Sequence, residues 1–444
     1  MKRENACDII GIVGLGRGAF ARKRKFYPER NYIMKVVRLG IIGLGNRGTG
    51  MLRDNFIHFE NVEFVAFCDR YQDRVDRAAS ILKENRPESS EPFMTTDHSE
   101  LLKRDDVDAV YIATSWETHV EVAIDALRAG KAVALEVGGA YTVDECYELV
   151  RAYEETKTPF MFMENCCYNK QELLVTAMAR AGKFGRVVHC SGAYGHDLRA
   201  EISGGNINRH YRLNNYKNRN CENYPTHELG PIAKLLDINR GNRMVALSSM
   251  ASLSAGLKEY VEENKLYEKD PTLKDATFNQ GDIVTTIIRC ENGETITLTL
   301  DTTLPRSYSR EFTVKGTKGR YDMNTNSVFF DGEKEYWSPT EYYGLCMNNA
   351  KKYENEFLPD AWKNMTENSK KYGHGGMDGI LFSEFLSALT EGKEMPIDVY
   401  DAAAWMVITA LSEISIAKGG ALVEIPDFTN GAYKTRPSKD VFDF

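Results

Sequence analysis

Three glycines near the start of the chain have the spacing of a loop that cradles phosphates. Gly43, Gly45 and Gly48 follow an apolar run and precede a stretch with helical spacing. In a dinucleotide-binding turn the first glycine permits the tight bend and the second lets a pyrophosphate approach the backbone. The third allows the helix to pack closely on the strand, and the NH groups at the helix N-terminus attract the phosphates. The alternative is a glycine turn with a purely structural role.

An acidic residue in the expected place makes this prediction more specific. Asp69 ends the next apolar run, 21 residues after Gly48, where a carboxylate accepts hydrogen bonds from the adenosine ribose. The same charge repels a 2′-phosphate, so the predicted cofactor is NAD rather than NADP. Arg70 and Arg74 weaken that preference.

One histidine has the sequence context of a proton-transfer group. Pro225 and Thr226 indicate a helix start, which places His227 in the first helical turn, three residues after Tyr224. Imidazole titrates near neutral pH, and the positive end of the helix favours its neutral form, which can act as a base. Taken alone, His227 could equally cap or pack the helix, and Tyr224 and Tyr308 could be core or rim aromatics.

The elements that would position these residues alternate between strand and helix up to residue 164. Apolar runs predict strands at 37–43, 62–68, 108–113, 131–136 and 159–163, and helical spacing predicts helices at 72–85, 117–129 and 143–156. This alternation predicts an α/β fold with an N-terminal Rossmann domain, a doubly wound parallel sheet. The segments 113–119 and 136–139 then follow strand ends, where open parallel sheets bind ligands.

The second half of the chain has a different pattern. A helix is predicted at 171–181 and a strand at 186–193, followed by strands at 244–250, 282–291, 295–300 and 310–315 and by helices at 378–389 and 399–416. These elements predict a C-terminal α+β domain with a mostly antiparallel open sheet, whose free face would suit a homo-oligomer. The predicted domains are 34–160 and 161–444.

Composition excludes several classes of protein. The chain has 444 residues and a net charge of −8, and residues 34–444 carry 48 basic and 61 acidic groups, so nucleic acid is not an expected partner. No apolar run approaches the ~20 residues of a membrane span, which argues against a membrane protein. Nine scattered cysteines without a Cys-x-x-Cys pair or zinc spacing argue against a disulfide framework and a metal site.

The first 33 residues stand apart from the rest of the chain. They hold 8 Lys/Arg and 3 Asp/Glu but lack the small-residue cleavage site of a secretory signal. Their glycine pattern, 14–18, is not followed by an amphipathic helix and a second strand. We therefore expect Met34 to be the start of the folded protein and residues 1–33 to be a disordered extension. Reduced cysteines fit a cytoplasmic protein, with export left open.

Longer motifs resemble a known superfamily and, within it, one family. The first half resembles the Gfo/Idh/MocA oxidoreductases, sugar-handling enzymes with a Rossmann domain and an α/β sheet domain. Their usual Glu-Lys-Pro, whose lysine assists hydride transfer, is replaced by Glu136, Val137 and Gly138. The second half resembles glycoside hydrolase family 109, the NAD-dependent α-N-acetylgalactosaminidases, and the resemblance runs from about 36 to 435. The motifs are Met163–Tyr168, Tyr194–Arg199, His210–Arg212, Tyr224–Pro231, Asn239–Arg243, Leu304–Arg310, His374–Asp378 and Ile425–Thr429.

The resemblance implies which residues meet the cofactor and the substrate. Besides Gly43 and Gly45, NAD would be bound by Asn46, Arg47, Gly48, Asp69, Trp116, Glu117, Thr118, His119, Glu136, Val137 and Asn165. A small sugar or glycan would be bound by Tyr194, Arg212, Tyr224, Pro225, Thr226, His227 and Tyr308, of which Tyr194, Tyr224, His227 and Tyr308 are the catalytic candidates. His374 and Asp378 are expected to be structural, and no metal is implied.

The implied reaction is hydrolysis without net oxidation. NAD⁺ takes hydride from C3 of the sugar, which acidifies the C2 proton; the aglycone leaves by elimination, water adds, and the hydride returns. Tyr194 and Tyr308 can pass protons or bind hydroxyls beside a cation such as Arg212. The first alternative is a sugar or polyol dehydrogenase, against which Val137 argues, and the second is a non-catalytic NAD-sugar sensor. The sugar and the group that removes the C2 proton stay open.

Overall fold

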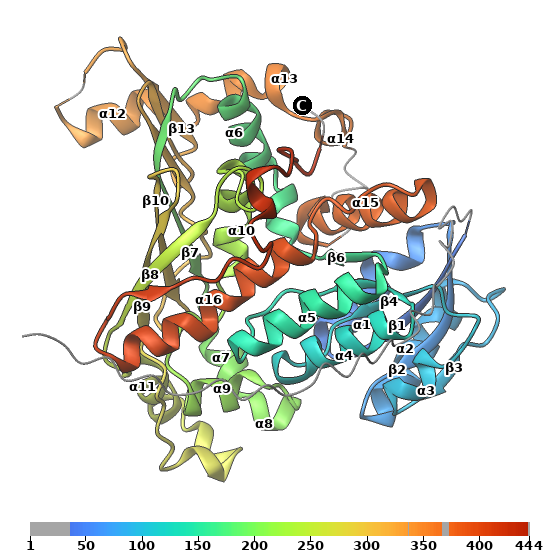
Figure 1. Cartoon of the computed structure of the whole chain (residues 1–444). Coiled ribbons are helices and arrows are strands. Elements are labelled where there is room, and N and C mark those ends of the chain that lie inside the picture. The colour runs from blue at the N-terminus through green and yellow to red at the C-terminus, as the bar shows by residue number, and fades with distance from the viewer. Residues whose placement is uncertain (1–35, 336, 366–372, 443–444) are drawn as a thin grey trace, which may run out of the picture.

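The computed structural model describes residues 36–335, 337–365 and 373–442 (Figure 1). The predicted extension, residues 1–33, and the predicted start at Met34 lie outside the described residues.

The first half forms the predicted parallel sheet. Its six strands, in the order β3-β2-β1-β4-β5-β6, are β1 (Val37–Ile42), β2 (Val62–Cys68), β3 (Phe93–Thr95), β4 (Ala109–Ile112), β5 (Ala132–Leu135) and β6 (Phe160–Phe162). The helices of this half are α1 (Asn46–Asp54), α2 (Gln72–Asn85), α3 (His98–Leu102), α4 (Trp116–Arg128) and α5 (Val143–Thr156). All residues of β4 and β5 are buried because helices cover both faces of the sheet. The strand order reverses between β1 and β4, and such a switch point opens a ligand crevice at the carboxyl ends of the strands.

The second half forms an eight-stranded sheet in the order β13-β12-β11-β7-β10-β9-β8-β14. Its strands are β7 (Val187–Gly195), β8 (Met244–Ala251), β9 (Ile283–Cys290), β10 (Thr295–Asp301), β11 (Thr313–Gly316), β12 (Gly319–Asp322), β13 (Ser327–Phe330) and β14 (Val423–Glu424). Neighbouring strands are antiparallel except β7 and β10, which pair in parallel. The prediction of a mostly antiparallel sheet is confirmed. Val188, Met250 and Ile287 are large apolar side chains left exposed on this sheet, and the homo-oligomer stays a prediction.

Several short elements differ from the predictions. The strand predicted from residue 310 begins only at Thr313, because Arg310 turns inward to bind Glu172. The strand patterns also failed to indicate the helices that connect the larger elements. These are α7 (Arg199–Ser203), α8 (Gly205–Asn208), α9 (Arg212–Asn218), α11 (Gly256–Glu263), α12 (Pro339–Cys346), α13 (Glu354–Phe357) and α14 (Asp360–Lys363). By contrast, α6 (Lys170–Arg180) agrees with the helix predicted at 171–181, and α10 (Thr226–Leu235) agrees with the helix start predicted at Pro225 and Thr226.

The last two long helices return to the first half of the molecule. They are α15 (Met377–Glu391) and α16 (Val399–Ala417), and Figure 1 shows α16 running beside α5. The NH of Ala140 donates to the carbonyl of Met406 at 3.1 Å, which ties the two halves together. Contrary to the expectation that no run approaches the length of a membrane span, α16 is long and apolar enough, with a mean hydropathy of 1.3. Because 78% of that stretch is buried inside the protein, we interpret it as a core helix.

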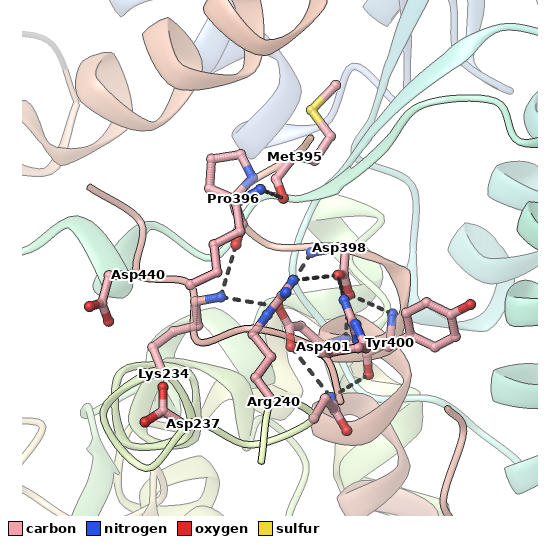
Figure 2. A network of polar contacts seen from close by, with 12 residues as sticks. Lys234, Asp237, Arg240, Met395, Pro396, Asp398, Tyr400, Asp401 and Asp440 are labelled. Carbon is pink, nitrogen blue, oxygen red and sulfur yellow. Dashed lines mark hydrogen bonds and ion pairs between the residues drawn. The ribbon is translucent and has the colours of Figure 1, made fainter. Parts of the chain in front are cut away.

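A buried charge network fixes the C-terminal end of α10 against the start of α16 (Figure 2). Lys234 donates to the carbonyl of Pro396 at 2.9 Å and to Asp401 at 3.2 Å. Arg240 donates to Asp398 at 2.7 Å, and Asp398 in turn caps α16. Buried charges are tolerated when they are paired in this way. The network matters for the site because α10 begins with the predicted substrate residues.

Candidate active site

The glycine turn joins the end of β1 to the start of α1. Gly43 has φ +93°, a conformation that favours glycine, and a Cβ built at Gly48 would lie 1.9 Å from the carbonyl oxygen of Gly43. α1 begins at Asn46 with Gly45 as its N-cap. No side chain caps this helix, and its first turn contains no acidic residue. The NH groups of the turn are therefore directed toward a site that suits an anion.

Asp69 fixes the turn from the end of β2. Its carboxylate accepts hydrogen bonds from the NH groups of Leu44 at 2.8 Å and Tyr71 at 2.9 Å. Arg74 lies 3.7 Å from the same carboxylate. The predicted ribose ligand thus also shapes the loop that would bind the pyrophosphate.

The Trp116–His119 segment forms the first turn of α4, after β4. Burial lowers the pKa of His119 to about 4, so this imidazole is neutral, and its Nε2 is buried without a hydrogen-bond partner among the described residues. A Cβ built at Gly138 would lie 2.3 Å from Trp116 Cδ1 and 2.5 Å from His119 Cε1. The glycine at 138 thus makes room for both rings.

Arg47 connects the glycine turn to the far end of the chain. Its guanidinium binds Glu136 at 2.9 Å and Asp378 at 2.8 Å. Asp378 also accepts from Asn165 at 2.7 Å and lies 2.8 Å from His374 Nδ1. Although burial opposes ionisation, the Arg47 charge and the His374 hydrogen bond hold the pKa of Asp378 well below its usual range. Asp378, expected to be only structural, therefore contacts two predicted cofactor residues.

These observations fit NAD. The turn holds glycine where a Cβ would clash, the helix N-terminus is uncapped, and a carboxylate stands at the end of β2. Buried polar atoms without partners among the described residues, Thr114 Oγ1 and His119 Nε2, lie at the same carboxyl edge of the sheet. The structure therefore brings the predicted cofactor residues to one edge.

The predicted sugar residues gather beside this edge, on β7, at the start of α9, in the segment 224–227 that leads into α10, and in the loop after β10. The ring centroids of Tyr194 and Tyr224 are 4.6 Å apart, and His227 lies 5.5 Å from Tyr194 and 4.7 Å from Tyr224. Tyr308 is more peripheral, 6.4 Å from Tyr194 and half exposed. Trp116 stacks on Tyr224 at 5.3 Å, so the cofactor and sugar halves of the candidate site are in contact.

His227 has a buried partner that the sequence analysis missed. Its Nδ1 lies 2.7 Å from Glu164 Oε1, which also accepts from the NH of Cys166 at 3.0 Å. Although burial opposes ionisation, the charge and hydrogen bond of His227 lower the pKa of Glu164. A carboxylate on Nδ1 holds the tautomer whose Nε2 can accept a proton. Ligand atoms of Glu164, Cys166 and His227 lie within 4.8 Å of one another, and the hydrogen bond already accounts for two of them.

Two arginines contact the tyrosines of the site. Arg212 lies over the rings of Trp116 and Tyr224 at 4.9 and 5.2 Å. The cation beside Tyr308 is not Arg212 but Arg310, which donates to the phenol at 3.1 Å and is held by the buried Glu172. Burial raises the pKa of Tyr194 to about 12, against the opposing charge of Arg212. Burial also raises the pKa of Tyr224 and Tyr308, so the three phenols are neutral hydrogen-bond donors at physiological pH.

Signals for the missed partners lay inside the resembling motifs. Glu164 directly precedes Asn165, and Arg310 ends the segment 304–310. His196, in the segment 194–199, lies 3.2 Å from the hydroxyl of Tyr194. Asp378 ends the segment 374–378, but nothing local indicated its partner, because Arg47 is 331 residues away.

A buried acid two residues before Tyr224 leads to a testable effect of pH on the stability of the fold. Glu222 is fully buried, and burial raises its pKa to about 8. The folded protein therefore holds this proton over a pH range in which the unfolded chain has lost it, and stability should fall as pH rises from about 4.5 to 8. We expect Glu222→Gln to melt several degrees higher than the wild type at pH 8 but not at pH 5, measured by thermal denaturation.

The exposed Glu84→Gln is the matched control and should melt with the wild type at both pH values. If Glu222→Gln changed the melting temperature equally at pH 5 and pH 8, ionisation of Glu222 would not be the cause.

Comparison with known proteins agrees with this geometry. Residues 168–435 match the family described as "Glycosyl hydrolase 109, C-terminal domain", and residues 37–163 match "Oxidoreductase family, NAD-binding Rossmann fold". A glycosyl hydrolase family 109 protein of Solibacter usitatus is 39% identical over 98% of both chains. An alpha-N-acetylgalactosaminidase of Tannerella forsythia is 37% identical over 90% of this chain and 87% of its own.

Solved structures show the same fold at low sequence identity. A levoglucosan dehydrogenase in complex with NADH and levoglucosan is 19% identical, with a TM-score of 0.63 over 88% of this chain and 99% of that one. An NAD-binding oxidoreductase from Klebsiella pneumoniae is 15% identical, also with a TM-score of 0.63, over 88% of this chain and 99% of that one. With an NAD-binding Rossmann domain and relatives similar along nearly its whole length, the chain belongs to glycosyl hydrolase family 109.

Proposed function

We propose that this chain is an NAD-dependent glycosidase that removes terminal α-linked N-acetylgalactosamine and recycles its cofactor in place. The relatives from Tannerella forsythia and Shewanella oneidensis that are named alpha-N-acetylgalactosaminidase support the substrate. The observation that carries the proposal is the His227–Glu164 pair, which lies among three tyrosines beside the dinucleotide edge.

Bound NAD⁺ would supply a hydride acceptor for C3 of the sugar and the hydride that restores it. The glycine turn and Asp69 would hold the pyrophosphate and ribose, and Arg47 would keep Glu136 in place at the end of β5. Trp116 touches Tyr224 and Arg212, so a sugar placed on these side chains would lie next to the cofactor edge.

The chain's own residues would handle the protons. A C3 ketone acidifies the neighbouring C2 proton, and Nε2 of His227 is the available base because Glu164 occupies Nδ1. The neutral phenols of Tyr194 and Tyr308 would donate hydrogen bonds to sugar oxygens. Val137 stands where related dehydrogenases carry lysine, so this chain would rely on the tyrosine–histidine group instead.

Proton NMR in D₂O with an aryl α-N-acetylgalactosaminide and no added cofactor tests the proposal. We expect release of the aryl group together with deuterium at C2 of the product sugar. The matching aryl α-galactoside, which lacks the acetamido group, is the substrate control and should react more slowly. Cleavage without C2 deuterium would contradict the elimination route. Net reduction of added NAD⁺ by free sugars, without cleavage, would establish the dehydrogenase alternative.

A further inference from the structure

A short segment from the second half of the chain, residues 209–212, contacts the adenosine end of the predicted cofactor site, and we call it the strap. Arg209, which follows α8, binds Asp73 of α2 through two hydrogen bonds of 2.9 and 2.6 Å. Its guanidinium also lies 4.3 Å above the ring of Tyr71. Tyr71 is itself attached to Asp69, the predicted ribose ligand, by its NH.

Arg74, the next residue of α2, also binds the strap. Its Nη2 donates to the carbonyls of Asn208 and Arg209 at 3.1 and 3.2 Å. Its Nη1 lies 3.7 Å from Asp69 and 3.5 Å from where a Cβ of Gly45 would stand. One guanidinium therefore reaches both the strap and the glycine turn where a pyrophosphate would bind.

The backbone of the strap is held in a costly conformation. Arg209 has φ +53° and ψ +48°, in the left-handed region that a residue with a side chain rarely adopts. Such strain persists only where surrounding contacts fix it, and it clusters at ligand clamps. Here the contacts come from Asp73 and Arg74, both on α2 of the first half.

The strap continues to the other end of the site. Tyr211 packs on Trp116 at 4.8 Å, and Arg212 lies over Trp116 and Tyr224. Residues 209–212 thus run from the predicted ribose ligand to the predicted sugar residues. A dinucleotide laid along this edge would be covered at both ends by the same four residues.

We infer that Arg209 and Arg74 form a clamp that retains the dinucleotide between catalytic cycles, with Arg74 as an added charge partner for the pyrophosphate. The inference rests on the proposed function, because only a cofactor that is recycled in place needs to be retained. Opening the clamp requires the Arg209–Asp73 and Arg74–carbonyl contacts to break together.

Retention is measured on the purified full chain without any sugar. The protein is loaded with ¹⁴C-labelled NAD⁺, gel-filtered, and diluted into excess unlabelled NAD⁺, and the bound label is followed over time. We expect the wild type to keep its label through gel filtration. Arg209→Ala, which loses an ion pair and a cation–π contact together, should release it about tenfold faster, and Asp73→Ala, which loses only the ion pair, about threefold faster.

Arg104→Ala and Asp106→Ala are matched controls. Arg104 also makes two hydrogen bonds to its aspartate and lies 4.5 Å over an aromatic ring, that of Phe93, but these contacts involve neither the glycine turn nor the strap. These controls should release NAD⁺ at the wild-type rate. If Arg209→Ala does not fold, Asp73→Ala breaks the same pair through an exposed side chain of α2.

Unchanged release from the folded variants would overturn the clamp, as would loss of label from the wild type during gel filtration. Because no sugar is present, the rate of NAD⁺ release tests the clamp independently of whether the protein has the proposed glycosidase activity.

Discussion

Replacing His227 by asparagine is expected to lower kcat for the aryl N-acetylgalactosaminide about a thousandfold, within the range that a positioned acid–base group contributes. In the proposed elimination a base must take the C2 proton, and the His227 ring, whose Nδ1 is held by Glu164, lies 5.5 Å from the ring of Tyr194 and 4.7 Å from that of Tyr224. Deuterium incorporation at C2 should fall with the same factor. Retained NAD⁺ should be unchanged, since His227 contacts Glu164, Tyr194 and Tyr224 and none of these lies in the glycine turn.

Two further variants make this result specific. Glu164→Gln removes the carboxylate that holds Nδ1 of His227, so we expect a loss of kcat smaller than that of His227→Asn. His189→Asn, on β7 but bound to Thr295, should behave as the wild type. A His227→Asn enzyme that still exchanged the C2 proton at the wild-type rate would assign the base to another residue.

The cofactor half could be predicted because its signals are local. Gly43, Gly45 and Gly48 stand in one turn, and Asp69 ends the very next strand, so periodicity and spacing alone place them together. The strand-end rule then brings the segments 116–119 and 136–137 to the same edge. Each of these inferences needs only the order of strands along the chain.

The partners that tune the site could not be predicted in this way. Glu164 reaches His227 across 63 residues, and Arg310 is held by Glu172 across 138. Neither contact follows from a period of two or 3.6 residues, because both depend on how α10 and α6 pack around the η2 turn (Asn165–Tyr168). Pairing of buried charges is a property of the assembled core.

The strap was missed for a related reason. The strap, residues 209–212, lies within a segment, 199–218, whose three helices have only four to seven residues. Each is too short to show a full amphipathic period. Their positions are set instead by ion pairs with the first half, such as Arg209 with Asp73. A local pattern therefore indicates where the cofactor would bind but not what covers it.

Gly48→Ala is expected to reduce NAD⁺ affinity about a hundredfold, by analogy with the ~10²-fold loss of rate that a misplacement of about 1 Å causes in active sites. The new Cβ would lie 1.9 Å from the carbonyl oxygen of Gly43, so α1 or the turn must move, and the NH groups that face the pyrophosphate would move with it. Equilibrium binding of NAD⁺ to the apo protein, followed by tryptophan fluorescence, measures the loss. Glycosidase activity without added NAD⁺ should disappear in parallel.

Gly50→Ala is the matched control on the same helix. A Cβ at Gly50 meets nothing within 4 Å, so the substitution should leave NAD⁺ binding unchanged and stabilise α1 by about 0.5–1 kcal/mol, the difference in helix propensity between glycine and alanine. Equal losses from both variants would show that α1 tolerates no alanine and would remove the argument from close packing. Full NAD⁺ binding by a folded Gly48→Ala protein would mean that the dinucleotide does not depend on this turn, because the turn cannot keep its geometry with a methyl group there.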